Sequence, residues 1–205
     1  MDELKHAILD PGLSYYIPTV DPLSANVVLA EGREYLWVFD VGAHPDIPKL
    51  LKTETKPLRI ILSHFHPDHC SNLDSMDFAD LFLGKNTYRY VKQGQIVESD
   101  LFFSDGDLKI HIFPIPSSHA KGSLALEVNN TYSFLGDAAY ATKKDGKTVY
   151  NAGLLKEQIR ILSELNSPYV LLSHQEPFLQ TRQEVLSFLK EIYATRKTDQ
   201  AYIEV

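Results

Sequence analysis

The chain has 205 residues, one cysteine and a formal net charge of −7. This length fits one domain, and a hydrophobic fraction of 44% is enough for a packed core, which excludes wholesale disorder. No apolar run is long enough for a membrane-spanning helix, and the first residues lack the pattern of a secretory signal. The acidic balance disfavours a nucleic-acid partner, and the lone Cys70 excludes an internal disulfide. We therefore expect a cytoplasmic protein with neither a membrane nor a nucleic acid as partner.

The N-terminal part of the chain begins without a clear element. Residues 1–25 carry three prolines and little periodicity, which predicts an irregular surface segment. Asn26–Ala30 and Tyr35–Phe39 are apolar runs separated by a glycine-containing turn, a pattern typical of a hairpin. A short helix is expected over Asp46–Lys52, and the apolar run Arg59–Leu62 predicts a buried strand.

Short elements alternate through the rest of the chain. We expect helices at 68–76 and 86–91, the second capped by Asn86, and strands at 79–83, 96–99, 108–113, 123–128 and 132–135. Later come an amphipathic helix at 154–165, a buried strand at 169–172 and a helix at 181–193 that starts with a capping box. Residues 195–205 are a polar tail without a predicted element. This order predicts a single domain, 1–205, with two sheets covered by helices, a four-layer αββα sandwich.

A dense group of ligand-type side chains directly follows the strand at 59–62. His64, His66, Asp68 and His69 lie within six consecutive positions. In an extended chain His64 and His66 point to the same side, so two imidazoles can bind one metal. Asp68 and His69 fall at the start of the next helix and can reach a second metal nearby. Core packing does not require such a group, so the pattern indicates a transition-metal site.

Three more candidate ligands lie at or beyond the ends of other predicted strands. Asp137 follows the strand at 132–135, His174 follows the strand at 169–172, and His119 lies in the loop after the strand at 108–113. Strand ends commonly deliver ligands from adjacent loops to one edge of a sheet. All seven side chains offer nitrogen or oxygen, which suits Zn(II), with Fe(II) or Mn(II) as alternatives.

The segment from His64 to His69 matches the His-x-His-x-Asp-His signature of the metallo-β-lactamase superfamily. Four further motifs of that superfamily follow its expected order, at Asp40, His119, Gly136-Asp137 and Ser173-His174. The chain therefore resembles this superfamily from Asn26 to the C-terminus. Because Asp137 stands where the antibiotic-destroying branch has a cysteine, the resemblance is to thioester, lactone and phosphoester hydrolases. The glyoxalase-II type carries a C-terminal helical domain, but only about thirty residues follow His174 here.

The resemblance implies a dinuclear metal hydrolase and assigns roles to residues. His64, His66 and His119 would hold one metal, Asp68, His69 and His174 the other, and Asp137 would bridge them. A hydroxide between the metals would attack the carbonyl of a small ester, lactone or thioester. Asp68 would act in catalysis as well as in binding, and Asp40 would support the ligand loop without contacting a metal.

The role of Tyr140 remains open between two readings. The segment Asp137-Ala138-Ala139-Tyr140 resembles one in acyl-homoserine lactone lactonases, where the tyrosine hydroxyl holds the lactone carbonyl. In the other reading Tyr140 is an aromatic residue that packs beside the site.

Other functions of the same fold are also open. A mononuclear iron enzyme similar to persulfide dioxygenases, and a phosphodiesterase or nuclease, are the alternatives to the hydrolase. Diiron reductases of this superfamily are disfavoured, because they have a glutamate at the position of His66 and carry a flavin domain.

Overall fold

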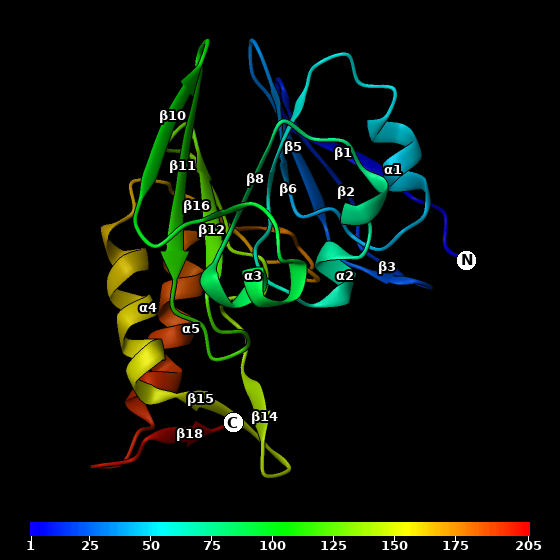
Figure 1. Cartoon of the computed structure of the whole chain (residues 1–205). Coiled ribbons are helices and arrows are strands. Elements are labelled where there is room, and N and C mark those ends of the chain that lie inside the picture. The colour runs from blue at the N-terminus through cyan, green and yellow to red at the C-terminus, as the bar shows by residue number, and fades with distance from the viewer.

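The computed structural model describes residues 1–205 and contains two large β-sheets that pack face to face (Figure 1). The first sheet has seven strands, in the spatial order β1 (His6–Asp10), β2 (Leu13–Tyr16), β5 (Val27–Glu31), β6 (Leu36–Phe39), β7 (Leu58–Ile61), β8 (Asp80–Leu83) and β9 (Gln95–Ile96). The second has six, in the order β10 (Leu101–Asp105), β11 (Leu108–Ile115), β12 (Ser123–Val128), β13 (Tyr132–Phe134), β16 (Tyr169–Leu171) and β17 (Leu179–Thr181).

Helices cover the outer face of each sheet, which completes four layers (Figure 1). The first sheet carries α1 (Asp46–Leu51), α2 (Pro67–Cys70), the 3₁₀ turn Leu73–Ser75 and α3 (Lys85–Val91), and the second carries α4 (Ala152–Glu164) and α5 (Arg182–Ala194). The predicted αββα sandwich is confirmed. No helix has the length and apolar character that a membrane crossing requires.

The alternation of side chains along the central strands builds the layers. In β6, Trp37 and Phe39 belong to the core between the sheets, whereas Leu36 and Val38 pack with α1 on the other side. All four are buried, as expected for a strand covered on both faces. The core between the sheets also contains Ile110, Leu124, Leu126 and Phe134 from the second sheet.

Parallel pairing brings several loops to one edge of the sandwich. β6, β7 and β8 run parallel in the first sheet, and β13 and β16 run parallel in the second. The segments that follow these strands therefore emerge at the same edge. Two small sheets complete the fold: β3 (Thr19–Val20) with β4 (Leu23–Ser24), and β14 (Thr142–Lys144) with β15 (Lys147–Asn151) and β18 (Tyr202–Glu204).

The structure corrects both ends of the predicted domain. Residues 1–25 are not irregular, because β1 and β2 lie among them and extend the first sheet antiparallel to β5. The segment 195–205 is not an uncommitted tail, because β18 pairs with β15. In β1 exposed and half-buried residues alternate, and β18 has one buried side chain, Ile203. Edge strands of this kind lack the strong apolar pattern of central ones.

Several shorter elements also differ from their prediction. The helix expected over 68–76 is split into α2 and the 3₁₀ turn, and Gly84 rather than Asn86 is the N-cap of α3. The strand expected over 96–99 ends at Ile96. The hairpin of β5 and β6, helix α4, and the capping box of Thr181 and Glu184 at α5 are confirmed.

Candidate metal centre

The seven predicted ligands converge at the edge where the parallel strands end. His64 and His66 follow β7, α2 carries Asp68 and His69, and Asp137 and His174 follow β13 and β16. His119 lies in the loop between β11 and β12. The ligand atoms form two groups, in each of which all atoms lie within 4.8 Å of one another. The groups are His64, His66 and His119, and Asp68, His69, Asp137 and His174.

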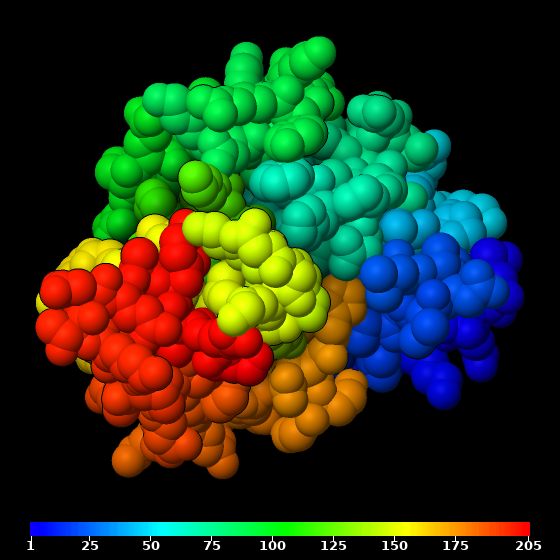
Figure 2. Space-filling model, turned by 90° about the horizontal axis from the view of Figure 1, so that it is seen from below, coloured from blue at the N-terminus to red at the C-terminus, as the bar shows by residue number.

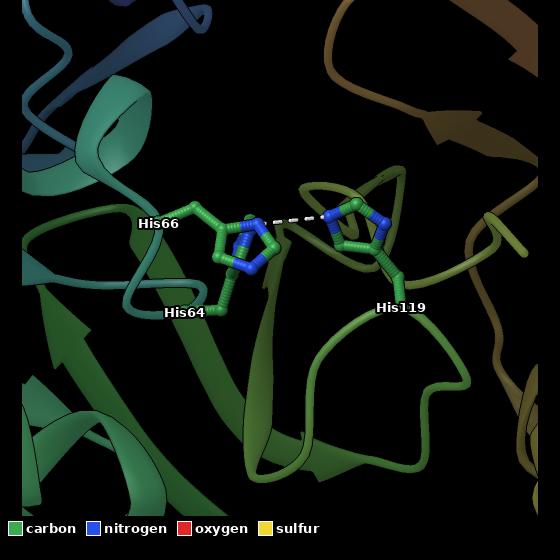
Figure 3. Close-up of side chains that lie close together, drawn as sticks. All are labelled: His64, His66 and His119. Atoms are coloured by element: carbon green, nitrogen blue, oxygen red, sulfur yellow. Dashed lines mark hydrogen bonds between the residues drawn. The ribbon is translucent and has the colours of Figure 1, made fainter. Parts of the chain in front are cut away.

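The first group consists of three imidazoles that face one another (Figure 3). The Nε2 atom of His119 lies 3.0 Å from Nδ1 of His66. The ring centroids of His64 and His66 are 4.5 Å apart, and those of His64 and His119 are 5.4 Å apart. His64 is buried, whereas His119 is 24% exposed and opens toward solvent.

The second group combines two imidazoles with two carboxylates. His174 Nε2 lies 2.9 Å from Asp68 Oδ2, and His69 Nε2 lies 3.4 Å from the same oxygen. Asp137 joins the group through Oδ1, which is 3.4 Å from His69 Nε2 and 4.0 Å from His174 Nε2.

Asp137 faces both groups at once. Its Oδ1 atom points to the second group, while its Oδ2 atom lies 3.4 Å from His119 Nε2 in the first. A carboxylate with one oxygen toward each group can contact both. Asp137 is 8% exposed, so both oxygens are largely removed from water.

A hydrogen-bonded chain behind the ligands fixes which imidazole nitrogen faces the site. Asp40 is fully buried, and its carboxylate accepts hydrogen bonds from the Ser63 backbone N–H, the Ser63 hydroxyl and His69 Nδ1. Because a carboxylate only accepts, His69 Nδ1 carries a proton. The Ser63 hydroxyl gives its hydrogen to Asp40, so His64 Nδ1, 3.0 Å away, donates to Ser63. Nε2 of His64 and of His69 is thus left to face the site.

The pKa values of the buried ligands follow from these neighbours. Burial, followed by the neighbouring histidines, lowers the pKa of His64, so this imidazole is neutral, as a metal ligand must be. Burial alone would lower the pKa of His69, but the Asp40 and Asp137 carboxylates outweigh it and raise that pKa to about 10. A metal held by His69 Nε2 would therefore have to displace a proton, so its binding would weaken as the pH falls.

The buried polar atoms of the site fit a pair of divalent metals. His64 Nε2, His69 Nε2 and Asp137 Oδ1 are buried and have no hydrogen-bond partner. Leaving such an atom unpaired costs about 1–3 kcal/mol, and native proteins leave few. All three belong to the two groups; His64 Nε2 and Asp137 Oδ1 offer a lone pair, and His69 Nε2 would offer one once a metal has displaced its proton. Metal coordination would satisfy each of them.

The backbone at this edge adopts unusual conformations. Asp40 has a φ of 59° and His174 a φ of 62°, in the left-handed region that few non-glycine residues occupy. Gly136 also has a positive φ, and a Cβ there would lie 2.6 Å from the Ser63 Cβ. Strained residues of this kind cluster at functional sites.

Tyr140 lies beside the site, but its hydroxyl donates a hydrogen bond to the backbone. The hydroxyl donates to the carbonyl oxygen of Ser173 at 2.5 Å, and the Tyr140 ring centroid is 6.3 Å from that of His119. Burial, followed by the charge of Asp137, raises the pKa of Tyr140, so the hydroxyl keeps its proton.

Two supporting residues were not identified from the sequence. Ser63 links Asp40 to His64, and Asn26 accepts a hydrogen bond from the backbone N–H of His174 through its side-chain oxygen. Ser63 directly precedes the signature, so its position was a signal; Asn26 lies 148 positions from His174 and carried none.

Comparison with known proteins agrees with this geometry. Residues 20–79 match the family model of the metallo-beta-lactamase superfamily, a range that contains Asp40 and the segment from His64 to His69. The structure superimposes on a metallo-beta-lactamase from Pontibacter korlensis with a TM-score of 0.66 at 14% identity, covering 92% of this chain and 99% of that one. The chain has the metallo-β-lactamase fold. The predicted resemblance to this superfamily is confirmed.

Other solved structures of this fold differ in length and description. A flavo di-iron protein variant from Thermotoga maritima superimposes with a TM-score of 0.72 at 12% identity over 97% of this chain, which spans only 63% of that one. A superfamily protein from Sulfolobus tokodaii gives a TM-score of 0.58 at 17% identity, covering 86% of this chain and 83% of that one. No curated protein matches the sequence. At these identities the likeness establishes the fold.

Proposed function

We propose that the protein is a metal-dependent hydrolase of a small ester, lactone or thioester. The observation that carries this proposal is the placement of Asp137, whose two oxygens face two separate groups of ligand-type side chains. This arrangement supports a dinuclear site rather than two unrelated ones. Zn(II) is the metal that the nitrogen and oxygen donors suit first, with Fe(II) or Mn(II) as alternatives.

Each residue of the two groups would have a defined role in such a site. His64, His66 and His119 would hold one metal, Asp68, His69 and His174 the other, with Asp137 shared. Two divalent metals supply a lowered pKa of bound water and polarise a substrate carbonyl. The chain itself fixes the histidines from behind through Asp40 and Ser63, which keeps the donor atoms oriented toward the site.

Asp68 has a second task in this proposal. Burial would raise the pKa of its carboxyl, but the hydrogen bond from His174 and the neighbouring His69 outweigh burial and lower that pKa. Asp68 is therefore ionised at neutral pH. His69 and His174 both approach Oδ2, so Oδ1 is the atom that can take up a proton from attacking water and pass it to a leaving group.

The hydrogen bond of Tyr140 supports the packing reading of this residue. A hydroxyl that donates to the Ser173 carbonyl must give up that bond to hold a substrate carbonyl. We propose that Tyr140 holds the loop that carries His174.

An assay of substrate classes together with metal identity tests the proposal. The purified protein is assayed on a panel of lactones, thioesters, aryl esters and phosphodiesters, with His66→Ala as the matched inactive control. We expect hydrolysis of at least one carbonyl substrate, inhibition by a chelator, and recovery on adding back metal. Turnover only of phosphodiesters would favour the phosphodiesterase alternative. A protein that contains iron as its only metal, oxidises a persulfide and hydrolyses none of the substrates would favour the persulfide dioxygenase alternative.

A further inference from the structure

A cavity of about 590 Å³ adjoins the first ligand group. His119 lies in its wall, so the cavity borders the candidate metal centre at this residue. Phe65 and Tyr90 form another part of the wall, with ring centroids 4.3 Å apart and planes at 9° to each other. This stacked pair provides an apolar surface next to the ligand loop.

The charged side chains of the cavity all have one sign. Arg89, Lys121, Lys143 and Lys144 line it, and no aspartate or glutamate does. The chain as a whole has a net charge of −7, so this concentration of positive charge runs against its average. Positive side chains gathered in a concave surface attract and orient an anionic ligand.

None of these four cations is neutralised by a carboxylate of the protein. The lysine and arginine ion pairs of the structure involve other residues, namely Lys49, Lys56, Arg59, Lys85, Lys147 and Arg160. Lys143 donates to the hydroxyl of Thr148, and the ammonium of Lys144 lies 3.4 Å from the ring centroid of Tyr202. Both contacts position the side chain while leaving its charge available.

The cations come from three segments that specific contacts hold together. Arg89 is on α3, Lys121 is in the loop that carries His119, and Lys143 and Lys144 are on β14. A Cβ on Gly84, the N-cap of α3, would overlap the backbone carbonyl of Gly122, so only glycine allows this approach.

The C-terminal strand completes the remaining wall. β18 pairs with β15 and places Tyr202 beside Lys144. Seen from below, the yellow-green β14–β15 hairpin lies beside the red C-terminal segment (Figure 2).

We propose that this cavity binds a carboxylate or phosphate group of the substrate, so that the ester, lactone or thioester hydrolysed at the metal centre is an anion. The proposal rests on the proposed hydrolase function and adds the substrate class. The acyl chain would lie against Phe65 and Tyr90, between the reacting carbonyl near His119 and the anionic group at Arg89, Lys121 and Lys144.

A matched pair of aryl esters tests this class. 4-Nitrophenyl butyrate is neutral, and the mono-4-nitrophenyl ester of glutaric acid has the same acyl chain with a terminal carboxylate. We expect the wild type to prefer the anionic ester in kcat/KM. Arg89→Gln, Lys121→Gln and Lys144→Gln should each reduce that preference, the ratio of the two kcat/KM values, about fivefold, and the triple variant should reduce it about 100-fold. Lys190→Gln, the same charge change on the outer helix α5, should alter neither rate.

Calorimetry of the purified, metal-containing full chain gives a readout that needs no turnover. Glutarate probes binding of a carboxylate, and propylphosphonate probes binding of a phosphate-like group. Each should bind the wild type more tightly than the triple variant, and binding to the wild type should weaken at high salt. Equal binding and equal ester preference in both proteins, with hydrolysis intact, would overturn the inference but not the hydrolase function. No hydrolysis of any ester, with the calorimetric difference present, would overturn the hydrolase function instead. Tighter binding of a single-stranded RNA oligomer through these cations would replace the small anion by a polyanion and overturn the inference.

Discussion

Two buried aspartates, Asp40 and Asp105, lie at opposite ends of the sandwich, and the carboxylate of each accepts three hydrogen bonds. Asp105, at the turn between β10 and β11, accepts hydrogen bonds from the backbone N–H groups of Glu34 and Tyr35 and from Trp37 Nε1, at 2.7, 3.0 and 3.1 Å. Asp40 also accepts three hydrogen bonds, two from Ser63 and one from His69.

The two networks differ in whether their donor groups have a further polar atom that is left unpaired. Each donor to Asp105 has a single hydrogen and uses it there, so the network ends, and its effect is to tie the turns of the two sheets together. His69 has a second nitrogen, which is buried and unpaired beside Asp137. A carboxylate whose donors are all used up stabilises a fold, whereas one whose partner keeps an unpaired ring nitrogen among ligand-type side chains supports a binding site.

Replacing a ligand should have the largest effect. His66→Ala or Asp68→Ala removes a donor atom from one of the two groups, so we expect hydrolysis to fall to background. The circular dichroism spectrum should stay that of the wild type, because neither side chain belongs to a hydrophobic core cluster. Retained turnover in either variant, with full metal content, would remove that residue from the mechanism.

Asp40→Asn should have the next largest effect and should act through His69. The amide keeps the shape of the carboxylate but loses the negative charge that makes His69 a stronger metal ligand. Metal affinity and kcat/KM should therefore fall about 10–100-fold. Metal titration of the variant, followed by assay at saturating metal, checks this. An unchanged metal affinity would show that Asp40 only fills space.

Asp105→Asn is the matched substitution at the other end and should leave the site intact. We expect the free energy of unfolding to fall by about 1–3 kcal/mol and kcat/KM per folded molecule to stay the same, because this network does not reach the ligands. Denaturant unfolding with a parallel assay measures both quantities. A loss of activity without a loss of stability would contradict the comparison.

The contribution of Asp105 to the free energy of unfolding should depend on pH. Burial would raise the pKa of Asp105, but hydrogen bonds from Glu34 and Trp37 outweigh it, and the net pKa is lowered. A carboxyl with a lowered folded pKa stabilises the protein above its unfolded pKa, and this stabilisation is lost as the pH falls through the folded value. The difference in stability between wild type and Asp105→Asn should therefore shrink below about pH 4.

Tyr140→Phe should have the smallest effect. Loss of the hydrogen bond to Ser173 should lower the free energy of unfolding by about 1 kcal/mol and leave lactone turnover within about threefold of wild type. A marked drop in kcat on lactones, with unchanged metal content and unchanged aryl ester rates, would instead show that the hydroxyl contacts the lactone carbonyl.

The sequence predicts which ligand-type side chains converge better than it predicts the edges of the fold, for a physical reason. The residues from His64 to His69 are close together in the chain, and Asp137 and His174 follow strands with strong apolar patterns. β1 and β18 are edge strands with few buried residues, so periodicity does not reveal them. The hydrogen bond from the His174 backbone N–H to the Asn26 side chain joins segments far apart in the chain, and so do the cations around the cavity. No local pattern encodes such contacts.

The number of metals bound per chain tests the central claim most directly. Elemental analysis of the purified protein should find close to two transition metals per chain, and Asp137→Ala should lower that number, because one carboxylate faces both groups. A fully active protein that contains no transition metal would contradict the account.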